Sequence, residues 1–68
     1  MGLDPKKILA RRKAMGITQE QAGLAAGFEK LPKQTWARYE SGRETNVKLD
    51  KAVAIAKVLG VTVNDLLK

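Results

Sequence analysis

The sequence predicts an all-α fold of five short helices that pack as one domain over residues 1–68. Apolar residues recur at intervals of three and four, which is the spacing of one helix face. Residue types that cap helix N-termini stand before all of these segments except the third, and glycines follow the first four.

The first helix is predicted to run from Asp4-Pro5 to about Met15. Asp4 can accept hydrogen bonds from the free amides of the first turn, and proline suits the first helical position. Gly16 is a suitable left-handed cap. The cluster at 11–13, Arg-Arg-Lys, can be a solvated face or a phosphate-facing patch, and both interpretations stay open. The side chains expected to face the core are Ile8, Leu9 and Met15.

The second helix is predicted to begin at Thr18 and to end at Gly27. Thr18-Gln19-Glu20-Gln21 forms a capping box, in which the Thr18 hydroxyl caps the helix and Gln21 reaches back. A glycine in mid-helix costs ~1 kcal/mol relative to alanine. Gly23 therefore indicates the close approach of another backbone, for which the next helix is the natural candidate. The inward residues are unusually small: Ala22, Gly23, Ala25 and Ala26.

The third helix is predicted over Pro32–Ser41, after a connection formed by Phe28–Leu31. At least one of the apolar residues Phe28 and Leu31 should fill the corner of the core. Trp36 and Tyr39 are three residues apart and should share the buried face. The opposite arc carries Lys33, Gln34, Ala37, Arg38 and Ser41.

Positive charge stands where the third helix begins, at Lys30 and Lys33. A helix N-terminus is already positive, so these lysines are unfavourable for the fold. They become favourable if a phosphate or a guanine edge binds there. A charge placement that is unfavourable for the fold, as here, is expected at a functional site. Lysine, glutamine and arginine are also side-chain types that read base edges.

A fourth helix should run to about Leu59 and end at Gly60, with Asn46 as its candidate cap. Thr62-x-x-Asp65 is a second capping box and opens a short terminal helix that contains Leu66 and Leu67. The apolar stripe of the fourth helix consists of Leu49, Ala52, Val53, Ile55, Ala56 and Leu59.

The net charge is +6, and the basic surplus lies in residues 1–16 and 30–57. This distribution suits a polyanion, with nucleic acid as the first candidate, although a merely soluble basic surface explains the charge equally well. Histidine and cysteine are absent, and the acidic residues lie on separate helix faces. We therefore expect no enzyme activity, no metal and no cofactor. Without a signal peptide or an apolar run of membrane length, the protein is expected to be cytoplasmic.

Three stretches in the right order and spacing resemble the Cro/lambda-repressor (XRE-like) helix-turn-helix family. They are GITQEQ at 16–21, TWARYESG at 35–42 and IAKVLGVTVNDLL at 55–67, and the resemblance extends from about Ile8 to Leu67. It implies a compact five-helix lambda-repressor-like DNA-binding domain whose second and third helices form the helix-turn-helix. It also implies a cytoplasmic, nucleoid-associated transcription regulator of bacterial or phage type, usually a repressor. Such a protein binds double-stranded DNA as a homodimer on a near-palindromic operator.

The resemblance also implies roles for individual residues. Arg12 and Glu40 match an ion pair inside the domain. Val63 and Leu67 are candidates for the dimer surface, although Leu67 can equally belong to the core. The positions whose side chains enter the major groove are Lys33, Gln34 and Arg38, with Ala37 placed to touch a thymine methyl. The positions expected on phosphates are Gln19, Lys30, Ser41 and Arg43.

This chain departs from the family pattern at three places. The turn at Phe28–Leu31 is about three residues longer than usual, which can move the start of the third helix relative to the groove. Trp36 stands where isoleucine is common, opposite the small Ala22, and such an exchange conserves core volume. Val47 replaces a frequent proline, which leaves the loop before the fourth helix less rigid.

Two other functions remain open from the sequence. A helix-turn-helix domain can hold a partner protein, as an antitoxin does, and bind DNA weakly. Single-stranded RNA binding is a weaker alternative, because the core needs Trp36 and Tyr39. The sequence contains no ligand domain, so control by a small molecule needs another chain.

Overall fold

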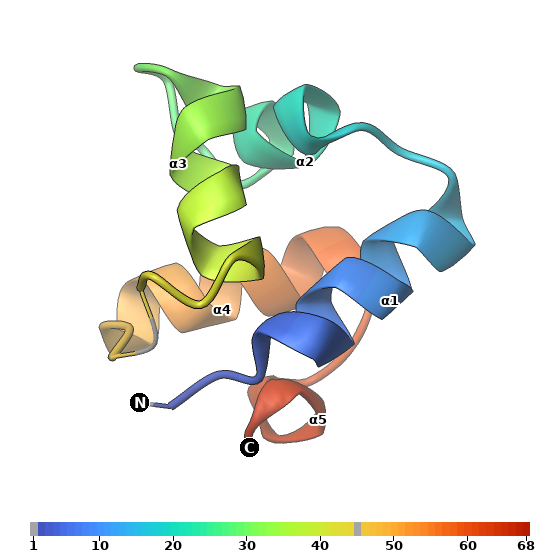
Figure 1. Ribbon diagram of the computed structural model, residues 1–68, viewed down its shortest axis with the longest axis vertical. Helices are drawn as coiled ribbons and strands as arrows, with labels where there is room; N and C mark the ends of the chain where they lie inside the picture. Colours follow the sequence, from blue (N-terminus) through green and yellow to red (C-terminus); the bar gives the residue numbers. More distant parts are fainter. Residues whose placement is uncertain (1, 45) are drawn as a thin grey trace.

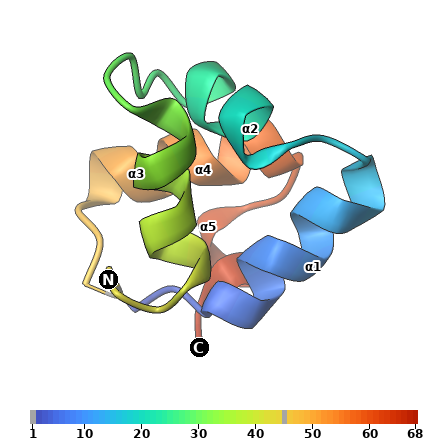
Figure 2. The ribbon, with the colours of Figure 1, turned by 45° about the horizontal axis from the view of Figure 1, so that its top comes forward.

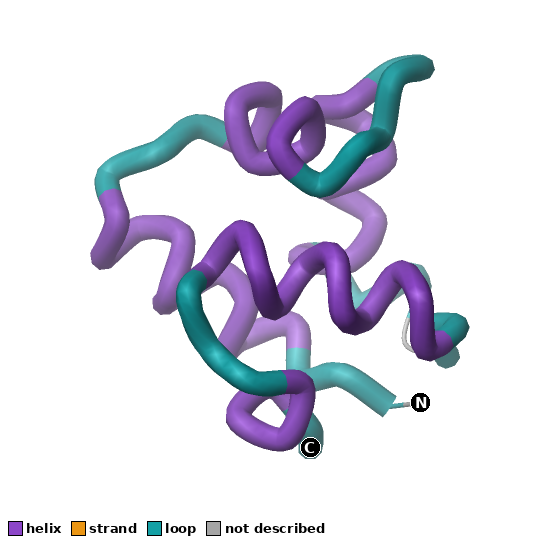
Figure 3. Tube along the Cα trace, turned by 180° about the vertical axis from the view of Figure 1, so that it is seen from behind, coloured by secondary structure: helices purple, strands orange, loops and turns teal. Residues whose placement is uncertain are grey.

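Five helices pack around a single core in the computed structural model, which describes residues 2–44 and 46–68 (Figure 1). The helices are α1 (Pro5–Met15), α2 (Gln19–Ala25), α3 (Pro32–Glu40), α4 (Leu49–Leu59) and α5 (Val63–Leu66). α4 crosses the middle of the molecule and contacts α1, α2 and α5, while α3 packs on α1 and α2. The view from behind shows the same arrangement, in which the described residues form helices and loops only (Figure 3). The predicted all-α fold is confirmed.

Three of the helices begin at the side-chain caps that the sequence predicts. Asp4 accepts from the backbone N–H of Lys6 at 2.9 Å at the start of α1. Thr18 and Gln21 exchange both hydrogen bonds of a capping box at the start of α2, at 3.0 and 2.9 Å. Thr62 and Asp65 do the same for α5. Each cap satisfies amides that the helix itself leaves without partners.

The fourth helix begins later than predicted, and Asn46 is not its cap. α4 starts at Leu49 with Lys48 as the N-cap residue, and no side chain caps it. The backbone of Asn46 instead pairs with Gly2 in an antiparallel bridge. Val47, which follows, is 4% exposed and belongs to the core. The loop before α4 is therefore fixed by backbone pairing and by a buried valine.

The predicted close approach at Gly23 is present. A Cβ added to this glycine would lie 2.3 Å from the carbonyl oxygen of Pro32, far inside van der Waals contact. Gly23 is buried in α2, and Pro32 is the first residue of α3. The absence of a side chain at Gly23 therefore lets the first turn of α3 rest directly on α2.

Trp36 lies at the centre of the core and is completely buried, as is Ala22 on α2. Phe28 is 6% exposed, and its ring lies 6.5 Å from that of Trp36 and 5.8 Å from that of Tyr39. Phe28 is therefore the residue of the turn that fills the corner. Both residues of the volume exchange that the sequence suggests, Trp36 and Ala22, therefore belong to the core.

The two ends of the chain are joined by backbone hydrogen bonds, which the sequence does not reveal. Leu3 is 1% exposed and pairs with Leu67 in an antiparallel bridge. The N–H of Asp4 donates to the carbonyl of Leu66 at 2.7 Å, and the N–H of Lys68 donates to Gly2 at 3.2 Å. Both ends consequently lie together beside α5, at the bottom of Figure 1.

Three residues predicted to face the core are exposed. Met15 is 42% exposed because α1 carries its last turn past the end of α4 (Figure 1). Leu49 is 60% exposed because it opens α4 ahead of Ala52, the first buried residue of that helix. Ala25 is exposed because it lies outside the arc of about 100° that contains Ala22, Gly23 and Ala26.

Candidate nucleic-acid interface

The outer arc of α3 forms one exposed polar surface. Lys33, Gln34, Arg38 and Ser41 are exposed, whereas Trp36 on the opposite side of the same helix is buried. A shallow hollow along this arc is lined by Gln34, Ala37, Arg38, Ser41 and Arg43. The structure thus brings together five of the eight residues predicted to contact bases or phosphates.

Lys33 and Gln19 line a second hollow, between α3 and the start of α2. Arg12, Thr18 and Glu20 complete its lining. Lys33 and Gln34 are consecutive in α3, so the first turn of this helix contributes one residue to each hollow. Glu20 adds a negative charge to the second hollow, which makes it less favourable for a phosphate than the first.

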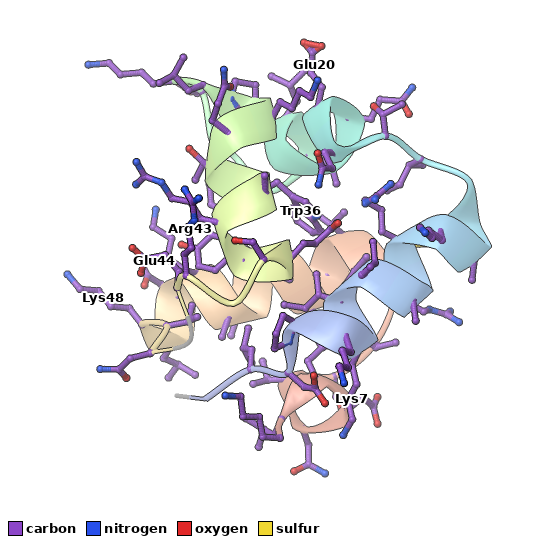
Figure 4. The ribbon with its side chains drawn as sticks, in the orientation of Figure 1. Lys7, Glu20, Trp36, Arg43, Glu44 and Lys48 are labelled. Carbon is purple, nitrogen blue, oxygen red and sulfur yellow. The ribbon has the colours of Figure 1, made fainter. Side chains whose placement is uncertain are left out.

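The loop that follows α3 is attached to the end of the helix. The carbonyl oxygen of Arg38 accepts from the N–H groups of Arg43 and Glu44, at 3.1 and 3.2 Å. Arg43 and Glu44 consequently project on the same side of the molecule as Lys48 (Figure 4). This attachment places the guanidinium group of Arg43 beside the outer arc of α3.

Ser41 and Lys30 are both predicted to contact phosphates, but the structure places them differently. The Ser41 hydroxyl donates to the Arg38 carbonyl at 3.2 Å, so its one proton must turn away from this bond before it can reach a phosphate. Lys30 lies in the turn before α3 and lines neither hollow. Its carbonyl accepts from the Thr35 hydroxyl at 3.4 Å, which joins the turn to α3.

Glu40 joins the first three helices through its carboxylate. Arg12 of α1 donates to both carboxylate oxygens, once from Nε and once from Nη2 at 3.1 Å. The Gln19 amide of α2 donates at 3.2 Å, and the Trp36 indole N–H also donates. Arg12 further donates to the carbonyl of Ile17 at 2.8 Å. The structure therefore contains the ion pair that the family resemblance implies, extended by two neutral donors.

The environment of Glu40 favours its ionised form. Burial by itself raises the pKa of this carboxyl group, since desolvation penalises the charge. The hydrogen bonds from Arg12, Trp36 and Gln19 outweigh burial, and the pKa of Glu40 lies below its ordinary value of 4.5. The side chain is 4% exposed and that of Arg12 is 13% exposed, so water screens this pair weakly.

Two of the three residues of the basic cluster at 11–13, Arg11 and Arg12, form hydrogen bonds within the protein. Arg11 donates to the carbonyl of Leu59 at 3.0 Å, at the end of α4. Arg12 is bound to Glu40. Lys7, one turn earlier, donates to the carbonyl of Leu67 at 2.7 Å (Figure 4). Arg11 and Lys7 thus complement the negative ends of α4 and α5.

Sequence reasoning missed the parts that Gln19 and Trp36 play in the Glu40 network. Trp36 and Glu40 are four residues apart, and this spacing places two side chains together on one helix face. That spacing could have revealed their hydrogen bond. Gln19 lies on another helix, and no sequence signal connects it to Glu40.

The helix-turn-helix family model matches residues 8–66 of this chain. The chain belongs to the Cro/C1-type (XRE-like) helix-turn-helix family. No curated protein and no solved structure matches it. The family consists of DNA-binding regulators of transcription, so the helix-turn-helix formed by α2 and α3 is a double-stranded DNA-binding element. Within residues 2–44 and 46–68, none of the helices has the length and apolarity that a membrane span requires.

Proposed function

We propose that the protein is a sequence-specific transcriptional repressor that places α3 in the major groove of duplex DNA. The observation that supports this proposal best is the division of α3 into two faces. One face is fixed in the core by Trp36, and the other exposes Gln34 and Arg38. A buried face holds the helix rigid, and an exposed face of hydrogen-bonding groups can read base edges.

Base recognition is assigned to Lys33, Gln34 and Arg38. The Gln34 amide suits adenine N6 and N7, and the cations of Lys33 and Arg38 suit guanine O6 and N7. Ala37 lies in the same hollow, where its methyl group can meet a thymine methyl. Phosphate contacts are assigned first to Arg43 and Lys30, which are both exposed. Gln19 and Ser41 also belong to this set, although each already donates a hydrogen bond within the protein.

The same proposal includes a homodimer on a near-palindromic operator. One domain offers few base contacts, and two copies would bind half-sites about 34–36 Å apart, one helical turn along the DNA. We assign the dimer contact to the region of α5 that includes Val63 and Leu67, both of which are half-buried against the core. Repression then follows from occupancy of the operator.

Selection of bound sites from random duplexes, followed by titration of the selected duplex, tests this function. Gln34→Ala should weaken binding to that duplex by about 1–3 kcal/mol and relax the preference at one base pair. Equal weakening on every sequence would contradict a base-reading role for Gln34. If the wild-type protein shifts no duplex at moderate salt, the result favours a partner-binding module of the antitoxin kind.

A further inference from the structure

Leu31 has two features that are unfavourable for folding, its exposure and its backbone conformation. The residue is 65% exposed, and its backbone is left-handed with φ at 48°. Over residues 2–44 and 46–68 it is the only residue other than glycine with a positive φ. This conformation is unfavourable for a residue with a side chain, because it brings Cβ too close to the following carbonyl oxygen. Neither burial nor backbone preference explains a leucine at this position.

The turn around Leu31 is anchored on both sides. Phe28 fills the corner of the core at one end, and Lys51 lies 5.7 Å from the centre of its ring. Pro32 rests on Gly23 at the other end. The N–H of Thr35 donates to the Leu31 carbonyl at 2.9 Å, so the first turn of α3 also holds this residue. Leu31 is therefore exposed on a fixed turn that projects past the end of α3 (Figure 2).

Leu31 has charged neighbours on both sides. Lys30 precedes it and Lys33 follows Pro32, and both lysines are exposed. Contact surfaces for protein partners are depleted in lysine at their centres. A surface that binds nucleic acid, in contrast, favours lysines around a point of base contact. The neighbours of Leu31 thus favour DNA as the molecule that it meets.

Residues at the start of a recognition helix are those that contact base edges. Leu31 immediately precedes α3, and Gln34 follows one turn later. The apolar group that a base pair offers in the major groove is the C5-methyl of thymine. An exposed leucine at this end of α3 can bury that methyl group and needs no hydrogen bond to do so.

We propose that Leu31 is a specificity-determining residue that contacts the C5-methyl group of one thymine in each half-site. This inference rests on the proposed function, because it requires α3 to lie in the major groove. It adds a contact that the lengthened turn provides beyond those of Lys33, Gln34 and Arg38. The gain from this contact offsets the unfavourable backbone and exposure of Leu31.

The test replaces thymines of the selected duplex, one position at a time, by deoxyuridine, which lacks the methyl group. At one thymine per half-site, distinct from the thymine assigned to Ala37, loss of the methyl group should weaken binding by the wild-type protein about fourfold, the value of one buried methyl group. Leu31→Asn should bind the thymine and deoxyuridine duplexes equally, because asparagine accepts the left-handed conformation and removes the apolar contact. Leu31→Met should restore the preference for thymine.

Two controls separate this contact from a change in folding or in general affinity. Leu24→Gln removes the other exposed leucine of the helix-turn-helix, which is 57% exposed, and should keep the full thymine preference. Thermal melting of Leu31→Asn should show no loss of stability. If wild type binds a selected duplex but Leu31→Asn keeps the deoxyuridine sensitivity, the inference about Leu31 is wrong and the proposed function stands. If wild type binds no duplex, both are overturned.

Discussion

Replacement of Glu40 by glutamine tests whether one carboxylate holds α1, α2 and α3 together. The amide keeps the shape of the side chain but removes its charge. It also turns one acceptor into a donor, so at least one donor among Arg12, Gln19 and Trp36 faces a group that cannot accept. Glu40→Gln should therefore destabilise the fold.

The size of the effect follows from burial. The side chains of Arg12 and Glu40 are 13% and 4% exposed, so the pair differs from a surface salt bridge. Removing one partner of a buried pair costs about 3–5 kcal/mol, and the partial exposure of Arg12 places the expected loss near the lower end, at about 3 kcal/mol. In a domain of this size 1 kcal/mol corresponds to about 4–8 °C in Tm. We therefore expect Tm to fall by about 12 °C or more.

The same substitution should change the response to acid. The pKa of Glu40 is lowered in the folded state, so its contribution is fully present above the ordinary value of 4.5 and is lost as pH falls through the folded pKa. The difference in Tm between wild type and Glu40→Gln should thus be largest near neutral pH. It should shrink on acidification below about pH 5, as the wild-type carboxylate itself takes up a proton.

Thermal melting followed by circular dichroism, at neutral pH and at several acidic values, measures both effects. Glu29→Gln is the matched control, since Glu29 is exposed in the turn after α2 and its loss of charge should leave Tm nearly unchanged. The reasoning is refuted if Glu40→Gln melts as close to wild type as Glu29→Gln does. A gap that stays constant down to low pH would contradict the lowered pKa.

Three further substitutions test other features. Gly23→Ala should destabilise the fold by at least about 1 kcal/mol in urea unfolding, despite the better helix propensity of alanine. The reason is that its Cβ would lie 2.3 Å from the Pro32 carbonyl oxygen. A gain in stability would contradict this close approach. Thr18→Ala should cost about 1 kcal/mol in the same assay through loss of the cap of α2. Arg43→Ala should lower the salt dependence of DNA binding by about one unit at unchanged preference, whereas Lys7→Ala, beside α5 (Figure 4), should leave that slope unchanged.

Local signals in the sequence predicted most of the fold because they depend only on neighbouring residues. The Thr18 and Thr62 capping boxes depend only on residues within one helical turn, and so does the left-handed conformation of Gly16. The periodicity also placed Trp36 correctly in the core. The periodicity placed Met15 wrongly in the core. The spacing of apolar residues shows which face of a helix is apolar, but it does not show where the neighbouring helix ends.

The residues that sequence reasoning missed depend on contacts between distant parts of the chain. Leu3 is buried because residues near the two ends pair, and helical periodicity gives no information about a residue that lies outside the helices. The same holds for Val47, which the family pattern placed in the loop before α4 and whose burial the sequence did not predict. At the interface, the exposed arc of α3 was predictable from spacing, whereas the hydrogen bond between Gln19 and Glu40 depends on how α2 meets α3.

The pairing of Gly2 with Lys68 makes the domain suitable for tandem fusion. Both residues lie beside α5, on the side of the molecule away from the turn before α3 (Figure 1). Because the proposed dimer contact is also at α5, the ends of two copies would lie near each other, and a flexible Gly/Ser linker could join them without spanning the half-site spacing of about 35 Å. Joining Lys68 of one copy to Gly2 of a second would make occupation of the second half-site intramolecular and leave both copies of α3 uncovered. Such a single-chain protein would no longer depend on protein concentration for pairing its two copies of α3.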